Sequence, residues 1–218
     1  MTTTRTIEAT THGRFLIEPP ATRDPPLVVV GFHGYAEDAE AQLARLRSIP
    51  GSDRFVLLSV QGLHRFYRGR TQDVIASWMT GQDREIAIAD NLRYVAAVVD
   101  QVAGEWRTAG KIVFAGFSQG VAMAFRAACA AKQAVGGVIA LGGDVPPEIG
   151  RSLLARLPAT LLGRGTRDEW YSTDMFEADA SRLRAAGADV RQFAFDAGHE
   201  WTPEFNAAAG AFLTSLTR

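Results

Sequence analysis

The sequence predicts a doubly wound α/β domain with a mostly parallel central sheet and helices on both faces. Short apolar runs alternate along the chain with longer amphipathic segments, the order expected of repeated strand–helix units. Most of these runs lack polar alternation, which is typical of strands covered on both faces. The length of 218 residues suits one unit, so we expect residues 1–218 to form a single domain.

Each element is expected from its own apolar pattern. The expected strands are an edge strand Gly13–Glu18, then Leu27–Phe32, Phe55–Val60, Ile112–Phe117, Val135–Leu141, Thr160–Gly163 and Val190–Phe195. The expected helices are Glu37–Ser48, Arg84–Thr108, Gln119–Lys132, Thr173–Ala186 and Pro203–Leu216. The helix from Arg84 is the clearest, because its apolar residues recur at steps of four and three and form one core-facing stripe. The segment from Leu141 to Ala159 is too short to form a separate lid domain.

Composition argues against several classes of protein. The formal net charge of −1, without a basic cluster, argues against a nucleic-acid partner. No apolar stretch is long enough for a membrane span, and the first residues lack the apolar core of a secretory signal, so we expect a cytoplasmic protein. The single cysteine, Cys129, cannot form an internal disulfide, and the scattered histidines predict no metal site.

The stretch Gly116-Phe117-Ser118-Gln119-Gly120 has the form G-x-S-x-G at a junction between an expected strand and an expected helix. In this context the motif is typical of a nucleophile carried on a sharp turn. Glycine suits the flanking positions because the turn leaves little room for a Cβ atom. We therefore expect Ser118 to be a nucleophile and the Gln119 N–H to be one oxyanion donor.

A serine nucleophile needs a base and an acid, which follow it in this kind of fold. Of four histidines only His199 follows Ser118, and it lies between the last expected strand and the last expected helix. Asp168 follows an expected strand at the same edge of the sheet and is the preferred acid; Asp144, one strand earlier, is the alternative. The second oxyanion donor is expected to be the Tyr35 N–H, in the turn after the first central strand.

The connection Gln61–Asp83 is unusually long for a compact domain, and such connections are often functional. It carries Phe66 and Trp78, which could form walls for an acyl group, and Arg68 and Arg70, which could bind a carboxylate or phosphate. In the alternative interpretation, the aromatic side chains anchor the loop and the arginines are solvated.

Together these motifs resemble the carboxylesterase/phospholipase family of α/β-hydrolases, which includes acyl-protein thioesterase-like enzymes. The chain departs from many relatives at Ala36, where they have a second glycine. The resemblance implies an α/β-hydrolase fold and a serine esterase that uses no metal or organic cofactor. Its expected substrates are small acyl esters or thioesters, with lysophospholipids as a further candidate. The matching pieces are His33-Gly34, Gly116-Phe117-Ser118-Gln119-Gly120, Gly165-Thr166-Arg167-Asp168 and Gly198-His199-Glu200.

These residues predict acyl transfer in two steps through an acyl-enzyme, with a small-molecule ester or thioester as the partner. One alternative is a catalytically silent binding module with a hydrolase fold, but such a module would usually have lost a triad residue. A dinucleotide-binding domain is also α/β, yet no G-x-G-x-x-G follows the first strand.

Overall fold

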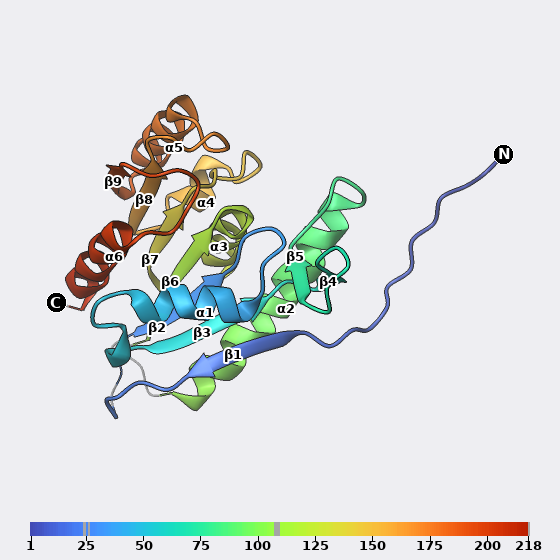
Figure 1. Ribbon diagram of the computed structural model, residues 1–218, viewed down its shortest axis with the longest axis horizontal. Helices are drawn as coiled ribbons and strands as arrows, with labels where there is room; N and C mark the ends of the chain where they lie inside the picture. Colours follow the sequence, from blue (N-terminus) through green and yellow to red (C-terminus); the bar gives the residue numbers. More distant parts are fainter. Residues whose placement is uncertain (24, 26, 107–109, 218) are drawn as a thin grey trace.

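The computed structural model describes residues 1–23, 25, 27–106 and 110–217, and its centre is a seven-stranded sheet (Figure 1). The strand order is β1-β3-β2-β6-β7-β8-β9. β1 pairs antiparallel with β3, and the other neighbours pair in parallel. The strands are β1 (Arg14–Glu18), β2 (Leu27–Phe32), β3 (Val56–Gln61), β6 (Lys111–Phe117), β7 (Ala134–Leu141), β8 (Ala159–Gly165) and β9 (Asp189–Phe195).

Helices cover both faces of this sheet, which explains why the central strands are apolar throughout. One face packs against α1 (Ala39–Ser48) and α6 (Pro203–Leu216). The other packs against α2 (Arg84–Glu105), α3 (Gln119–Ala130) and α5 (Thr173–Ala186). The prediction of a mostly parallel sheet with helices on both faces is confirmed, and the described residues include no separate lid domain.

The helix ends follow local sequence signals. The Asp38 side chain accepts a hydrogen bond from the Ala41 N–H at the start of α1, and Ser172 caps α5 in the same way. The apolar stripe of α2 packs into the core as predicted. This helix ends at Glu105, and residues 107–108, which the sequence placed in it, lie outside the described residues.

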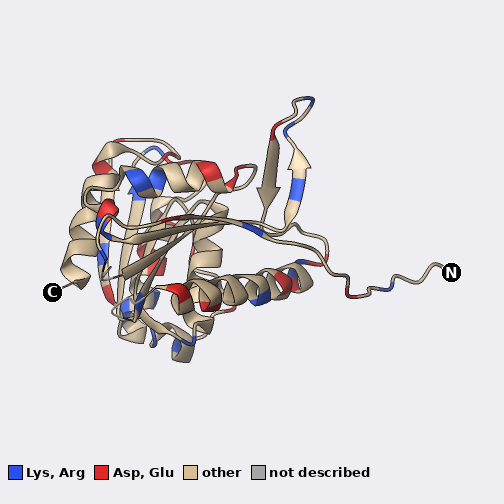
Figure 2. Cartoon of the chain, turned by 90° about the horizontal axis from the view of Figure 1, so that it is seen from below, with Lys and Arg blue, Asp and Glu red and all other residues tan. Residues whose placement is uncertain are grey.

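The long connection from Gln61 to Asp83 contains a hairpin that the sequence did not predict. Its strands are β4 (His64–Tyr67) and β5 (Val74–Ser77), and Figure 2 shows it projecting from the body of the molecule. Each strand has four residues, too few to give a clear alternating pattern. The sequence also did not predict the short helices η1 (Ser52–Arg54) and α4 (Arg151–Leu154), because three or four residues are too few to show a helical period. Across the described residues, no helix is both long and apolar enough to cross a membrane.

Candidate active site

Ser118 lies on a strained turn between β6 and α3. Its φ of 53° and ψ of −123° fall in a region that is costly for any residue except glycine. The flanking glycines make the turn possible: a Cβ atom at Gly116 would lie 2.4 Å from the Gly120 oxygen, and one at Gly120 would lie 2.1 Å from the Phe32 oxygen. The Ser118 N–H donates to the Leu141 oxygen at 2.9 Å. Close packing therefore holds Ser118 at the carboxyl edge of the sheet.

His199 and Asp168 are hydrogen-bonded, with 2.8 Å between His199 Nδ1 and Asp168 Oδ2. The other carboxylate oxygen of Asp168 accepts the N–H groups of Trp170 and Tyr171, each at 2.9 Å. The Asp168 side chain is only 1% exposed, so these bonds fix its orientation. With the carboxylate ionised, His199 Nδ1 carries the proton and Nε2 is free to accept another.

Ser118 and His199 line one cavity of about 280 Å³. The segment Gly142–Gly143 packs against both residues. A Cβ atom at Gly142 would lie 3.1 Å from His199 Cε1, and one at Gly143 would lie 2.4 Å from the backbone oxygen of Ser118. Asp144, the alternative acid, lies on the cavity wall, while Asp168 accepts the bond from His199. The other walls include Met79, Arg84, Trp170, Tyr171 and Met175.

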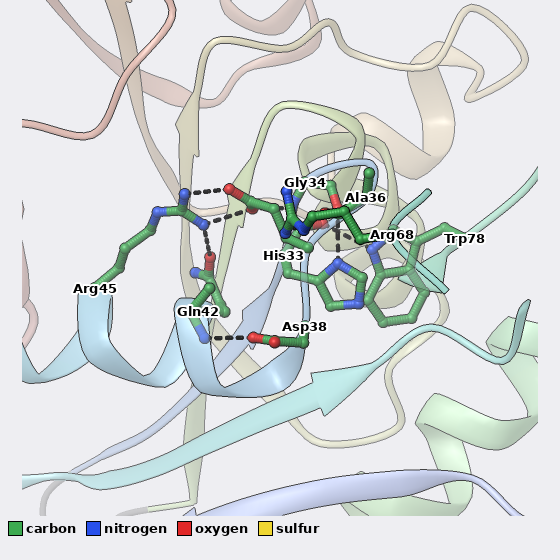
Figure 3. Close-up of polar contacts among 10 residues, drawn as sticks. His33, Gly34, Ala36, Asp38, Gln42, Arg45, Arg68 and Trp78 are labelled. Atoms are coloured by element: carbon green, nitrogen blue, oxygen red, sulfur yellow. Dashed lines mark hydrogen bonds and ion pairs between the residues drawn. The ribbon is translucent and has the colours of Figure 1, made fainter. Parts of the chain in front are cut away.

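An ion pair supports the turn expected to bind the oxyanion (Figure 3). The Gly34 N–H donates to Glu37 Oε2 at 2.7 Å, and Arg45 pairs with the same carboxylate at 2.5 Å. A Cβ atom at Gly34 would lie 3.3 Å from Ser118 Cβ, so the turn lies against the serine. Within the described chain, the N–H groups of Tyr35 and Gln119 donate no hydrogen bond, which leaves both available to an oxyanion.

Ala36 adopts a left-handed conformation with φ of 58°, at the position where many relatives have glycine. Its N–H donates to the Ala76 oxygen at 3.0 Å, and its oxygen accepts from Arg68 at 3.1 Å. These bonds to the β4–β5 hairpin hold the strained residue, so the turn keeps its shape without the second glycine.

His33 is fully buried beneath this turn and has a structural role. Its Nδ1 donates to the Gly34 oxygen at 2.7 Å, and its Nε2 accepts from the Gly62 N–H at 3.0 Å. Burial lowers the pKa of His33, so the ring is neutral when it makes both bonds. The Gln119 side chain also fixes nearby backbone, because it accepts from the Trp78 N–H at 2.9 Å and donates to the Met79 oxygen at 3.1 Å.

The structure does not bring the residues expected from the long connection to this cavity. Trp78 is fully buried and donates to the His33 oxygen at 2.8 Å, which favours the alternative interpretation that it anchors the loop. Phe66 lies on the hairpin, and its ring packs against the ring of Tyr35 with 6.0 Å between the centroids. Arg68 contacts the turn, Arg70 is exposed on the hairpin, and neither lines the cavity.

The loop after Asp168 is tied to the loop after β7 through the buried carboxylate of Asp179. The Tyr171 hydroxyl donates to Asp179 Oδ2 at 2.9 Å, and the Val145 N–H donates to the same oxygen at 3.0 Å. Burial raises the pKa of Asp179, and the charge of nearby Asp144 adds to the increase. Asp179 thus holds Tyr171 beside the carboxylate of Asp168.

Several cavity residues were missed in the sequence. Trp170 and Tyr171 stand only two and three positions after Asp168, and this proximity was a usable signal. Arg84 and Met175 lie near the starts of helices and carry no motif. In the part of the chain that the structure describes, no group of three or more His, Cys, Asp or Glu is arranged to hold a metal ion.

A family profile described as Phospholipase/Carboxylesterase matches residues 13–217. The chain therefore belongs to the phospholipase/carboxylesterase family of α/β-hydrolases, a family of serine hydrolases. No curated protein shows significant sequence similarity to it.

Solved structures agree with this assignment at the level of the fold. A Bacillus cereus carboxylesterase is 18% identical, with a TM-score of 0.72 over 94% of each chain. The acyl-protein thioesterase 2 of Zea mays is 17% identical, with a TM-score of 0.74 over 95% of this chain and 100% of its own. Esterase PE8 is 20% identical, with a TM-score of 0.75 over 94% of this chain and 100% of its own.

Proposed function

We propose that the protein is a serine carboxylic-ester hydrolase that works through an acyl-enzyme on Ser118. The observation that carries the proposal is the hydrogen bond from His199 to the buried Asp168, because His199 lines one cavity with Ser118 on its strained turn. Family membership supports the same reaction class.

In the first step, His199 Nε2 accepts the Ser118 proton as the hydroxyl oxygen attacks the ester carbonyl. The negative charge that develops on the carbonyl oxygen receives hydrogen bonds from the Tyr35 and Gln119 N–H groups. Asp168 stabilises the imidazolium, and His199 then protonates the leaving alcohol or thiol. In the second step water attacks the acyl-enzyme with the help of the same histidine and releases the acid.

The substrates that suit the site are small acyl esters or thioesters. Met79, Met175 and Trp170 give the cavity apolar walls next to the serine, and its volume of about 280 Å³ suits a short acyl group. Lysophospholipids remain a further candidate, since the family includes phospholipases.

Hydrolysis of a neutral activated ester, such as p-nitrophenyl butyrate, tests this proposal. Ser118→Ala should lower kcat by at least about 10³-fold with an unchanged circular dichroism spectrum. Ser181→Ala, which removes an exposed hydroxyl on α5, is the matched control and should keep wild-type kinetics. Near-full activity in Ser118→Ala would contradict the proposal, and ester binding without turnover by the wild type would favour the silent binding module.

A further inference from the structure

Two charged side chains on the walls of the cavity have no partner. Among the residues described, the side chains of Arg84 and Asp144 form no hydrogen bond or ion pair, either with each other or with a third group. Charged groups nearby are paired: Arg126 binds Glu148 at 2.5 Å behind the same wall. An unpaired charge on an open surface is usually just solvated. Arg84 and Asp144, in contrast, line the cavity that holds Ser118 and His199.

Arg84 adds a positive charge to the cavity wall. It is the first residue of α2, and the side chain of the preceding residue, Asp83, caps none of the N–H groups of the first turn. The uncapped turn adds partial positive charge to that of the guanidinium. A guanidinium binds a carboxylate or phosphate through two parallel hydrogen bonds, so this wall suits an anionic group.

Asp144 adds a negative charge to the cavity wall. Asp144 and Tyr171 line the same cavity, where burial raises the pKa of Tyr171 and the charges of Asp179 and Asp144 add to the increase. Trp170 is 80% exposed and lines the same cavity as Asp144. A carboxylate and an accessible indole face in one cavity are groups that can bind an ammonium ion.

We propose that Arg84 and Asp144 select a zwitterionic ester: Arg84 binds its anionic group, and Asp144 with Trp170 binds its cationic group. This inference rests on the proposed function and narrows its substrate class. Because both side chains are exposed, each charge should change selectivity by about tenfold, and added salt should weaken the effect.

The test uses matched activated esters of four kinds: neutral, anionic, cationic and zwitterionic. The readout is kcat/KM for each charged ester divided by kcat/KM for the neutral ester. Arg84→Gln should lower this ratio about tenfold for the anionic and zwitterionic esters, mainly through KM. Asp144→Asn should do the same for the cationic and zwitterionic esters. Arg84→Lys should keep part of the preference for the anionic ester, because it keeps the charge.

Two control variants remove the same charges at the opposite edge of the sheet. Lys111→Gln lies at the start of β6 and Asp189→Asn at the start of β9, whereas the cavity lies beyond the strand ends. Both should leave the ratios unchanged. The inference would be overturned if a cavity variant changed kcat/KM equally for all four esters or for none of them. It would also be overturned if the control variants changed the ratios as much as the cavity variants do.

The outcomes also separate this inference from the proposed function. If the wild type hydrolyses the neutral ester, Ser118→Ala does not, and the ratios stay flat in Arg84→Gln and Asp144→Asn, only the zwitterionic selectivity is refuted. If the wild type hydrolyses none of the four esters, the proposed function fails and the inference fails with it.

Discussion

Replacing Asp168 with asparagine should remove almost all turnover while the fold remains intact. Asp168 Oδ1 accepts two backbone N–H groups, from Trp170 and Tyr171, and Oδ2 accepts His199 Nδ1. The amide of Asp168→Asn must keep its oxygen toward the two N–H donors, since an NH₂ group there would face them without an acceptor. Its NH₂ group therefore faces His199 and forces the ring proton onto Nε2, which can then no longer accept the proton of Ser118.

The expected loss in kcat is on the order of 10⁴-fold, as for the wrong histidine tautomer in other triads. At 1.36 kcal/mol for each factor of ten, the barrier rises by about 5.5 kcal/mol. The assay is kcat for a neutral activated ester, with circular dichroism as the check on folding. Asp189→Asn, at the far end of β9, is the control for the loss of one carboxylate and should keep wild-type kinetics.

Asp144→Asn decides between the two acids that the sequence left open. Asp144 lines the cavity without accepting a bond from His199, so its substitution should cost at most about tenfold with the neutral ester. A larger loss in Asp144→Asn than in Asp168→Asn would refute the reasoning and make Asp144 the acid.

Three further predictions concern stability. Ala36→Gly should raise the free energy of unfolding, measured in urea, by about 1 kcal/mol, because glycine relieves the left-handed strain at a smaller entropy cost. A lower free energy of unfolding would show that Ala36 is not strained. Burial lowers the pKa of His33, so the unfolded chain binds a proton that the folded chain does not, and stability should fall as pH drops below about 6.5. His33→Gln should make that slope shallower, and an unchanged slope would refute the assignment. The pKa of Asp179 is raised by burial, so the wild type should lose stability as the pH increases above about 3.9, the unfolded value. Asp179→Asn should therefore gain stability relative to wild type over this increase, and a difference independent of pH would contradict this.

The fold and the residues proposed for catalysis were predictable because their signals are local. The central strands are apolar throughout, which predicts helices packed against both faces of the sheet, and the structure has helices on both faces. The G-x-S-x-G turn was recognisable within five residues, because its tight backbone leaves no room for a Cβ atom at Gly116 or Gly120, and only one histidine follows it in the sequence. Asp168 was preferred by strand order, and the structure brings it to His199.

The cavity walls were not predictable, because separate segments build them. The sequence left open whether Trp78 forms a wall or anchors the loop, because its hydrogen-bond partner His33 lies 45 positions earlier. Arg84, Asp144 and Trp170 come from the start of α2, the loop after β7 and the loop after β8, and no sequence pattern links the three. These side chains line one cavity with Ser118 only because the fold brings the three segments together.

The most direct test of the account is to map the adduct of a fluorophosphonate probe by mass spectrometry. The probe forms a covalent bond with an activated serine, so the wild-type protein should carry one adduct, on the peptide that contains Ser118. Ser118→Ala should carry none, and His199→Ala should react much more slowly because the hydroxyl lacks its base. An unlabelled wild-type protein, or an adduct on any residue other than Ser118, would contradict the account.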